Sequence, residues 1–147
     1  FLYNSFMTRT YLTEKVSTSK GTIYTYEKNA QTANTVIAYL KDNNAESALI
    51  YPEGLILNFL ADVKADDYYN SLIPLYSDSF GEHAFINHIK KTKPEYVVFN
   101  SLSMKEYSYD KICDSYATHI CQYVLDNYTQ VKDVDDGFRY IMFKRHQ

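Results

Sequence analysis

The sequence predicts an α/β domain with a mixed, largely parallel, Rossmann-like sheet, helices on both faces of that sheet and a C-terminal β-hairpin. Two short apolar runs, at 47–51 and 96–99, have the length and composition of strands buried on both faces. Segments with apolar residues at helical spacing alternate with them, and this alternation is typical of parallel sheets. Asp136-Gly137 separates two β-rich runs near the end of the chain, which predicts the terminal hairpin.

The length and composition predict one domain that spans residues 1–147. An apolar content of 46% is sufficient for a hydrophobic core, and a charged content of 22% argues against global disorder. The net charge of -3 gives no general attraction for nucleic acid, so we expect no nucleic-acid partner. The chain begins with Phe1 rather than Met, and we therefore expect it to be a fragment of a larger protein or a processed product.

The N-terminal half is predicted to contain a hairpin, two helices and one strand. These elements are a hairpin over 15–19 and 22–26, a helix over 30–43, the strand over 47–51 and a helix over 55–61. Val, Thr, Ile and Tyr around Lys20-Gly21 favour the hairpin, and one strand bent at the glycine is the alternative. Val36 and Leu40 belong to an apolar series at helical spacing. Residues 62–79 are expected to form a long, loose connection.

The C-terminal half is predicted to contain two more helices, one strand and the hairpin. These elements are a helix over 81–92, the strand over 96–99, a helix over 110–127 and a hairpin over 129–134 and 138–144. Apolar residues recur every four positions along the predicted 110–127 helix, which makes one side of it a core-facing stripe. Cys113 and Cys121 would lie roughly 12 Å apart along this helix. A disulfide requires Cα atoms within about 7 Å, so we expect two free thiols.

The turn Pro52-Glu53-Gly54, between a strand and a helix, is the expected binding crevice, because open α/β sheets bind ligands beyond the carboxyl ends of their strands. Glu53 either holds a hydroxyl or basic group there, or is a first-turn acid favoured by the helix dipole. Its negative charge disfavours phosphate at this helix end, and no glycine-rich nucleotide motif follows any strand, so no cofactor is expected. Ser101 follows the next strand and would line the same crevice if the two strands are parallel.

Other residue patterns bear on sugar binding, metal binding and catalysis. Tyr68 and Tyr69, which follow Asp66 and Asp67, predict either a sugar-binding lip or a solvated loop. The four histidines and the acidic run before Gly137 match neither zinc nor EF-hand spacing, so no metal site is expected. The serines after 96–99 lack a nucleophile-elbow pattern, and we expect no catalytic residues in this chain.

One series of motifs points to a family. It consists of Leu49-Ile50-Tyr51-Pro52-Glu53-Gly54, Leu57-Asn58-Phe59-Leu60, Tyr68-Tyr69, Pro74, Lys93-Pro94-Glu95-Tyr96-Val97-Val98, Tyr116 and Asn127-Tyr128. With these residues, 18–144 resembles the soluble C-terminal domain of bacterial polytopic membrane glycosyltransferases of the dolichyl-phosphate-mannose–protein mannosyltransferase-like kind, in the GT-C superfamily. The run PEG-x-x-x-NFL is its most distinctive part.

The resemblance implies a membrane-embedded portion of the same polypeptide before Phe1, with this domain on the periplasmic or outer face. It implies a polyprenyl-phosphate sugar donor, and catalytic carboxylates in the membrane portion rather than here. Pro52, Glu53, Gly54 and Asn58 are then motif positions. We therefore expect an accessory, non-catalytic domain whose partners are that membrane portion and a glycan or lipid-linked sugar. A stand-alone small-molecule or sugar-binding domain is the alternative, and a small hydrolase using Glu53 and Ser101 is a third reading.

Overall fold

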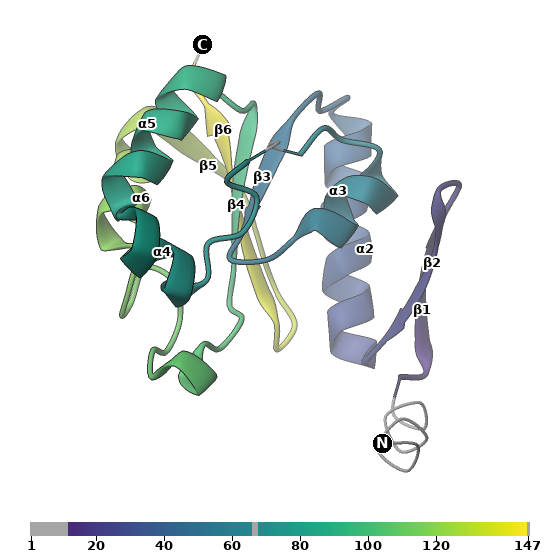
Figure 1. Cartoon of the computed structure of the whole chain (residues 1–147). Coiled ribbons are helices and arrows are strands. Elements are labelled where there is room, and N and C mark those ends of the chain that lie inside the picture. The colour runs from purple at the N-terminus through teal and green to yellow at the C-terminus, as the bar shows by residue number, and fades with distance from the viewer. Residues whose placement is uncertain (1–11, 66–67, 147) are drawn as a thin grey trace.

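The computed structural model describes residues 12–65 and 68–146, and Figure 1 shows these as an α/β arrangement with two sheets. The first half contains β1 (Glu14–Thr18), β2 (Gly21–Thr25), α2 (Glu27–Asp42), β3 (Ala48–Tyr51) and α3 (Leu55–Ala61). The second half contains α4 (Pro74–Phe80), α5 (Glu82–Thr92), β4 (Tyr96–Asn100), the short 3₁₀ helix η1 (Lys105–Tyr107), α6 (Thr118–Asn127), β5 (Tyr128–Asp135) and β6 (Arg139–Arg145). Among the described residues, no helix combines the length and apolarity needed to cross a membrane.

The main sheet has the strand order β3-β4-β6-β5, and it is mostly antiparallel. Only β3 and β4 pair in parallel, whereas β4 pairs with β6, and β6 with β5, in antiparallel fashion. The prediction of a largely parallel, Rossmann-like sheet is therefore wrong. The physical reason is that only two strands of this sheet, β3 and β4, are connected through helices. The other two form the hairpin around Asp136-Gly137, whose short turn requires antiparallel strands, and β6 then docks against β4.

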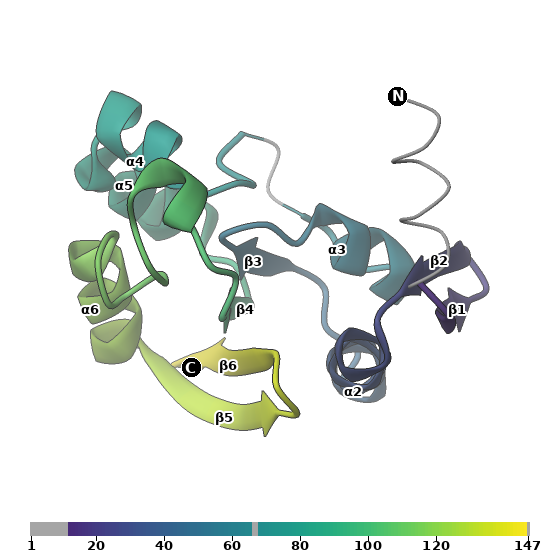
Figure 2. The same cartoon turned by 90° about the horizontal axis from the view of Figure 1, so that it is seen from below.

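Helices cover both faces of the main sheet, and each face has its own core (Figures 1 and 2). On one face, α5 and α6 pack Phe85, Ile89 and Ile120 against the sheet. On the other face, α2 and α3 pack Leu40 and Leu60 against it. The β1–β2 hairpin, confirmed here, lies on the side of α2 away from the main sheet and contributes Val16 to the second core.

The connection predicted as loose contains a helix. α4 begins at Pro74, a position where the missing N–H and fixed φ of proline suit the first turn. Its buried residues are Pro74 and Ser77, and the Ser77 hydroxyl donates to the Pro74 carbonyl. Leu75, Tyr76 and Phe80 on the same helix remain exposed, which explains why its sequence lacks a strong core-facing stripe.

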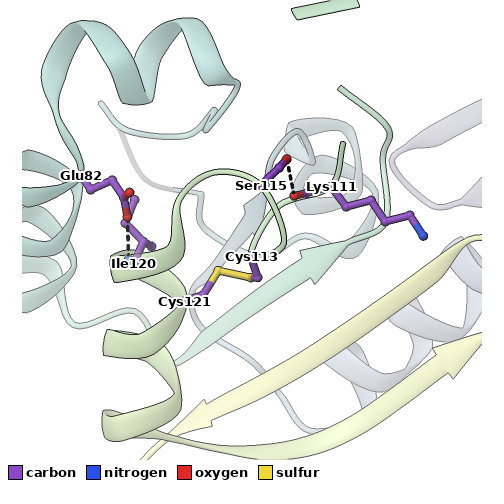
Figure 3. The surroundings of a disulfide bond; sticks show 6 residues. All are labelled: Glu82, Lys111, Cys113, Ser115, Ile120 and Cys121. Carbon is purple, nitrogen blue, oxygen red and sulfur yellow. Dashed lines mark hydrogen bonds between the residues drawn. A yellow bond between two sulfur atoms is a disulfide. The ribbon is translucent and has the colours of Figure 1, made fainter. Parts of the chain in front are cut away.

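The helix predicted over 110–127 is shorter, and the two cysteines are bonded. α6 begins only at Thr118, after Cys113 and Ala117 adopt left-handed φ angles of 72° and 56°. The intervening turn brings the Cα atoms of Cys113 and Cys121 to 5.6 Å, and a disulfide joins them (Figure 3). The prediction of free thiols is therefore wrong. Ile112, the first residue of the apolar series that recurs every four positions, is buried although it lies in the turn before the helix.

A carboxylate from another helix caps the start of α6. Glu82 in the first turn of α5 accepts a hydrogen bond from the backbone N–H of Ile120 at 3.0 Å (Figure 3). Unpaired N–H groups at a helix start need such acceptors. The residue at the N-cap position of α6, Ala117, has no side-chain acceptor to offer. The helix start is thus held by the disulfide and by tertiary contact rather than by local sequence.

Candidate functional site

A cleft of about 450 Å³ opens at the carboxyl ends of β3 and β4. These strands are parallel neighbours, so the segments that follow Tyr51 and Asn100 emerge at the same edge of the sheet. The cleft lies among this edge, the starts of α2 and α3, strand β2 and the C-terminal hairpin. It therefore occupies the position expected for a ligand site in a sheet with a parallel strand pair.

The turn after β3 is held by backbone contacts across the chain. The Pro52 carbonyl accepts from the N–H of Leu72 at 2.8 Å, and Glu53 forms an isolated antiparallel bridge with Ser71. The Tyr51–Pro52 peptide bond is cis. The Gly54 carbonyl then accepts the N–H of Leu57 and so begins α3. These contacts bring residues 70–71 to the rim of the cleft.

Gly54 permits a close approach between this turn and β3. A Cβ atom at Gly54 would lie 2.2 Å from Ile50 Cγ2 and 2.9 Å from the Ile50 carbonyl oxygen. Such separations are far below van der Waals contact. Glycine is therefore required here by packing, because its φ of -162° is accessible to any residue.

Asn100 joins the two strand ends. It is 4% exposed, its Nδ2 donates to the Glu53 carbonyl at 3.0 Å, and its Oδ1 accepts from the N–H of Leu102 at 3.0 Å. The amide thereby fixes the turn after β3 against the turn after β4. Because both ends of the amide are hydrogen-bonded, Asn100 is a buried polar residue with a structural role as well as a cleft-lining one.

Glu53 presents a negative charge at the cleft. Its side chain is exposed, and among the described residues no hydrogen bond or ion pair engages its carboxylate. The Tyr116 hydroxyl is buried and has no hydrogen-bond partner in the described part of the chain. Burial first, and the Glu53 charge second, raise the pKa of Tyr116 well above its usual range. Glu53 therefore acts electrostatically on the protein interior as well as on the cleft.

Aromatic side chains from the C-terminal hairpin form part of the cleft wall. The rings of Phe138 and Tyr140 lie 5.2 Å apart and tilted by 58°. Burial raises the pKa of Tyr140 to about 12. Beside them, Asn29, Asn70 and Ser71 supply groups that both donate and accept hydrogen bonds.

The four motif positions have different places in the structure. Glu53 and Gly54 line the cleft, as the strand–turn–helix pattern predicted. Pro52 is buried behind them, with its carbonyl bonded to Leu72. Asn58 is also buried, and its Nδ2 donates to the Ala48 carbonyl at 2.9 Å, which ties α3 to β3. The motif therefore consists of two cleft residues and two residues that support the turn.

The two tyrosines lie apart from the cleft. Tyr69 packs against Phe85 and His88, with ring centroids 4.7 and 4.8 Å away, and its carbonyl accepts the Tyr51 hydroxyl. Tyr68 is 73% exposed and stacks edge-on against Tyr69. Asp66 and Asp67 lie outside the described residues. The residues that follow the tyrosines, 70 and 71, are the ones that reach the cleft.

Ser101 does not line the cleft with Glu53. Its hydroxyl accepts from the N–H of Arg139 at 2.8 Å, and its own N–H donates to the Arg139 carbonyl. Its side chain lines a second cavity, of about 540 Å³, beside the Cys113–Cys121 disulfide. Ser101 and Glu53 therefore belong to different cavities, although both follow strands of the parallel pair.

Sequence reasoning did not identify Asn29, Asn70, Ser71, Asn100 or Tyr140 as cleft residues. Only Asn100 carried a usable signal, because a polar side chain directly after a buried strand marks the edge where ligands bind. The others reach the cleft from β6, the start of α2 and the 62–79 connection, whose relation to the strand ends depends on the tertiary fold.

Comparison with known proteins gives no relative: no protein-family model, curated protein or solved structure matches this chain. Within residues 12–65 and 68–146, no group of three His, Cys, Asp or Glu residues is arranged to hold a metal ion.

Proposed function

We propose that this chain is an extracytoplasmic accessory domain of a membrane glycosyltransferase that uses a polyprenyl-phosphate sugar donor. In this proposal the domain positions the glycan acceptor, or the sugar of the lipid-linked donor, in the Glu53 cleft and performs no chemistry itself. The observation that carries it is the composition of that cleft. The link to a membrane enzyme rests on the motif resemblance.

The cleft has the groups that sugar recognition requires. The Glu53 carboxylate accepts hydrogen bonds from hydroxyls, and the side chains of Asn29 and Asn70 both donate and accept them. The partly exposed ring of Phe138, against which the buried Tyr140 ring packs, offers an apolar face on which a sugar ring can stack. This mixture suits a neutral polyhydroxyl ligand better than an anion, because the charged group at the cleft is negative.

The same cleft gives little support to catalysis. Among the described residues that line it, Glu53 alone carries a carboxylate, and none is His or Cys. Hydrolysis of a glycosidic bond ordinarily uses two carboxylates that flank the bond. Ser101, the nucleophile of a Glu53–Ser101 hydrolase, lines another cavity. These positions favour binding over turnover.

The disulfide supports an extracytoplasmic location. Disulfides persist in secreted and periplasmic proteins, whereas cytosolic thiols are kept reduced. The Cys113–Cys121 bond joins the turn before α6 to that helix, and the Cα–Cα distance of 5.6 Å in the fold is one that a disulfide can span. An oxidising compartment is where the resemblance puts this domain.

The test measures glycan binding by the 147-residue chain. Titration with an oligosaccharide panel, followed by NMR, is expected to show saturable binding that Glu53→Gln weakens by about tenfold, the equivalent of about 1.4 kcal/mol. Glu106→Gln, an exposed acid outside the cleft, is the matched control and should bind as the wild type does. Glycan binding that Glu53→Gln does not weaken would show that the Glu53 cleft is not the binding site.

A second measurement addresses the accessory role. Incubation of the chain with a polyprenyl-linked sugar and acceptor should give no transfer, and turnover by these residues alone would contradict the proposal. The alternative, a stand-alone small-molecule or sugar-binding domain, shares the cleft and predicts the same binding. The coding sequence before Phe1 separates the two, because only the membrane enzyme requires a series of apolar helices there.

A further inference from the structure

Two lysines, an arginine and a histidine lie together at the opposite end of the main sheet from the Glu53 cleft. Lys90 and Lys93 come from the last turn and end of α5, and Arg145 and His146 come from the end of β6. Together they line a cleft of about 630 Å³. Because β6 is antiparallel to β4, its end lies at the amino end of β4, whereas the Glu53 cleft lies at the carboxyl end.

Contacts within the fold engage two of these side chains, Arg145 and Lys90. The Arg145 Nη1 donates to the Lys93 carbonyl at 2.5 Å, and the Arg145 backbone N–H donates to the Glu95 carbonyl at 2.9 Å. Lys90 Nζ lies 5.4 Å from the centroid of the Tyr123 ring, which forms part of the cleft wall. A guanidinium has five N–H donors, so the bond to Lys93 leaves Arg145 able to bind a further acceptor.

Carboxylates do not neutralise this cleft. None of the described residues that line it is Asp or Glu. Glu95, whose carbonyl accepts the Arg145 N–H, has its carboxylate bonded to the N–H of Glu46 and 3.5 Å from Lys144. The whole chain has a net charge of -3, so the local excess of positive charge does not follow from its composition.

Helix stability accounts for only part of the cluster. Cations in the last turn of a helix are favoured by its dipole, which explains Lys90 at the end of α5. The dipole of α5 does not explain why Arg145 and His146, at the end of β6, lie beside these lysines. It also does not explain the cleft that these residues form with Tyr123. The convergence of Lys and Arg from two elements is what recognition of a phosphate oxygen uses.

We propose that the cleft lined by Lys90, Lys93 and Arg145 binds a phosphate-bearing anion. Arg145 lines the cleft and keeps N–H donors beyond the one bonded to Lys93, and the two lysines add positive charge. The anion is either a soluble phosphate compound or the phosphate of a lipid headgroup, which present the same oxygens. The proposal uses no residue of the Glu53 cleft and does not depend on the glycan-binding function.

The test measures binding of inorganic pyrophosphate to the 147-residue chain by calorimetry, and binding to phosphatidylglycerol-containing vesicles by co-sedimentation. Phosphatidylcholine vesicles, which carry no net charge, are the control for adsorption that does not depend on an anionic headgroup. Lys90→Gln combined with Lys93→Gln is expected to weaken binding at least tenfold. Lys105→Gln combined with Lys132→Gln makes the same change in net charge at exposed sites outside the cleft and should change affinity less than twofold. Arg145→Gln is the second variant, and circular dichroism verifies the folding of each protein.

The outcomes separate the sources of phosphate. Pyrophosphate binding that is lost in the cleft variants but kept in the control supports the proposal with a soluble anion. Binding to phosphatidylglycerol vesicles alone, with the same dependence on the variants, supports it with a lipid headgroup. Absence of binding to both, equal loss in the cleft and control variants, or equal binding to phosphatidylcholine vesicles would overturn it.

Discussion

At the scale of single residues, the turn after β3 combines cleft-lining residues and structural residues within a few positions. Glu53 presents its carboxylate at the cleft, whereas Asn58, four residues beyond Gly54, is buried and bonded to the Ala48 carbonyl. Asn100 secures the turn from the neighbouring strand. The geometry of Glu53 therefore depends on hydrogen bonds made by neighbouring buried amides, which is how preorganised sites are generally supported.

The clearest prediction for a single residue concerns Gly54. Gly54→Ala should lower the free energy of unfolding by about 1–3 kcal/mol, because the new Cβ would overlap Ile50 and force β3 and the turn apart. Urea denaturation measures the change. The exposed Asn34→Ala on α2 is the control and should stay within about 0.5 kcal/mol of the wild type. A Gly54→Ala protein as stable as the wild type would contradict the close approach.

At the scale of secondary-structure elements, local pattern and tertiary contact determine different helices. α3 occupies the residues expected from the sequence, 55–61, because a glycine and an apolar stripe define it locally. α6 begins eight residues later than its apolar recurrence suggests. Its start depends on the Cys113–Cys121 bond and on Glu82 of α5, neither of which a periodicity of apolar residues can reveal.

The disulfide gives the prediction at this scale. Reduction should cost about 2.5 kcal/mol of unfolding free energy, the loop-closure contribution for a bond that spans a separation of eight residues. Denaturation with and without dithiothreitol measures this cost. The Cys113→Ala/Cys121→Ala double variant is the control and should not respond to reductant. Titration of two free thiols in the unreduced, denatured wild type would show that the bond does not form.

At the scale of the whole molecule, β4 connects the two cores. Val97 and Phe99 face the core beneath α5 and α6, and Tyr96 and Val98 face the core beneath α2 and α3. Alternation of side chains along a strand produces this division. Because one strand belongs to both cores, loss of either face should release the other.

We therefore predict a single unfolding transition for the whole chain. Phe85→Ala should cost about 3–5 kcal/mol and Leu40→Ala about 2–5 kcal/mol, since both side chains are 0% exposed and lie on opposite faces. Far-UV circular dichroism and tyrosine fluorescence should report the same midpoint in each variant. Leu125→Ala, at a side chain that is 56% exposed, is the control with little effect. Two separated transitions in either core variant would show that the faces unfold independently.

Short-range sequence patterns are sufficient to predict several elements of this fold and the strand edge at which a cleft opens. The buried runs at 47–51 and 96–99, the hairpins and α3 follow from composition and turn residues, whose effects extend over a few positions. The crevice after Tyr51 was predicted from the same local signals, and the structure has a cleft there.

The sheet order, the disulfide and the full set of cleft residues depend on tertiary packing and do not follow from local patterns. β6 docks against β4 and makes the sheet mostly antiparallel, a pairing between segments about 40 positions apart that no short-range pattern specifies. The same docking brings Tyr140 to the Glu53 cleft and Arg145 to the α5 lysines. These contacts join segments that are far apart in the sequence, and they form only when the sheet and its helices pack together.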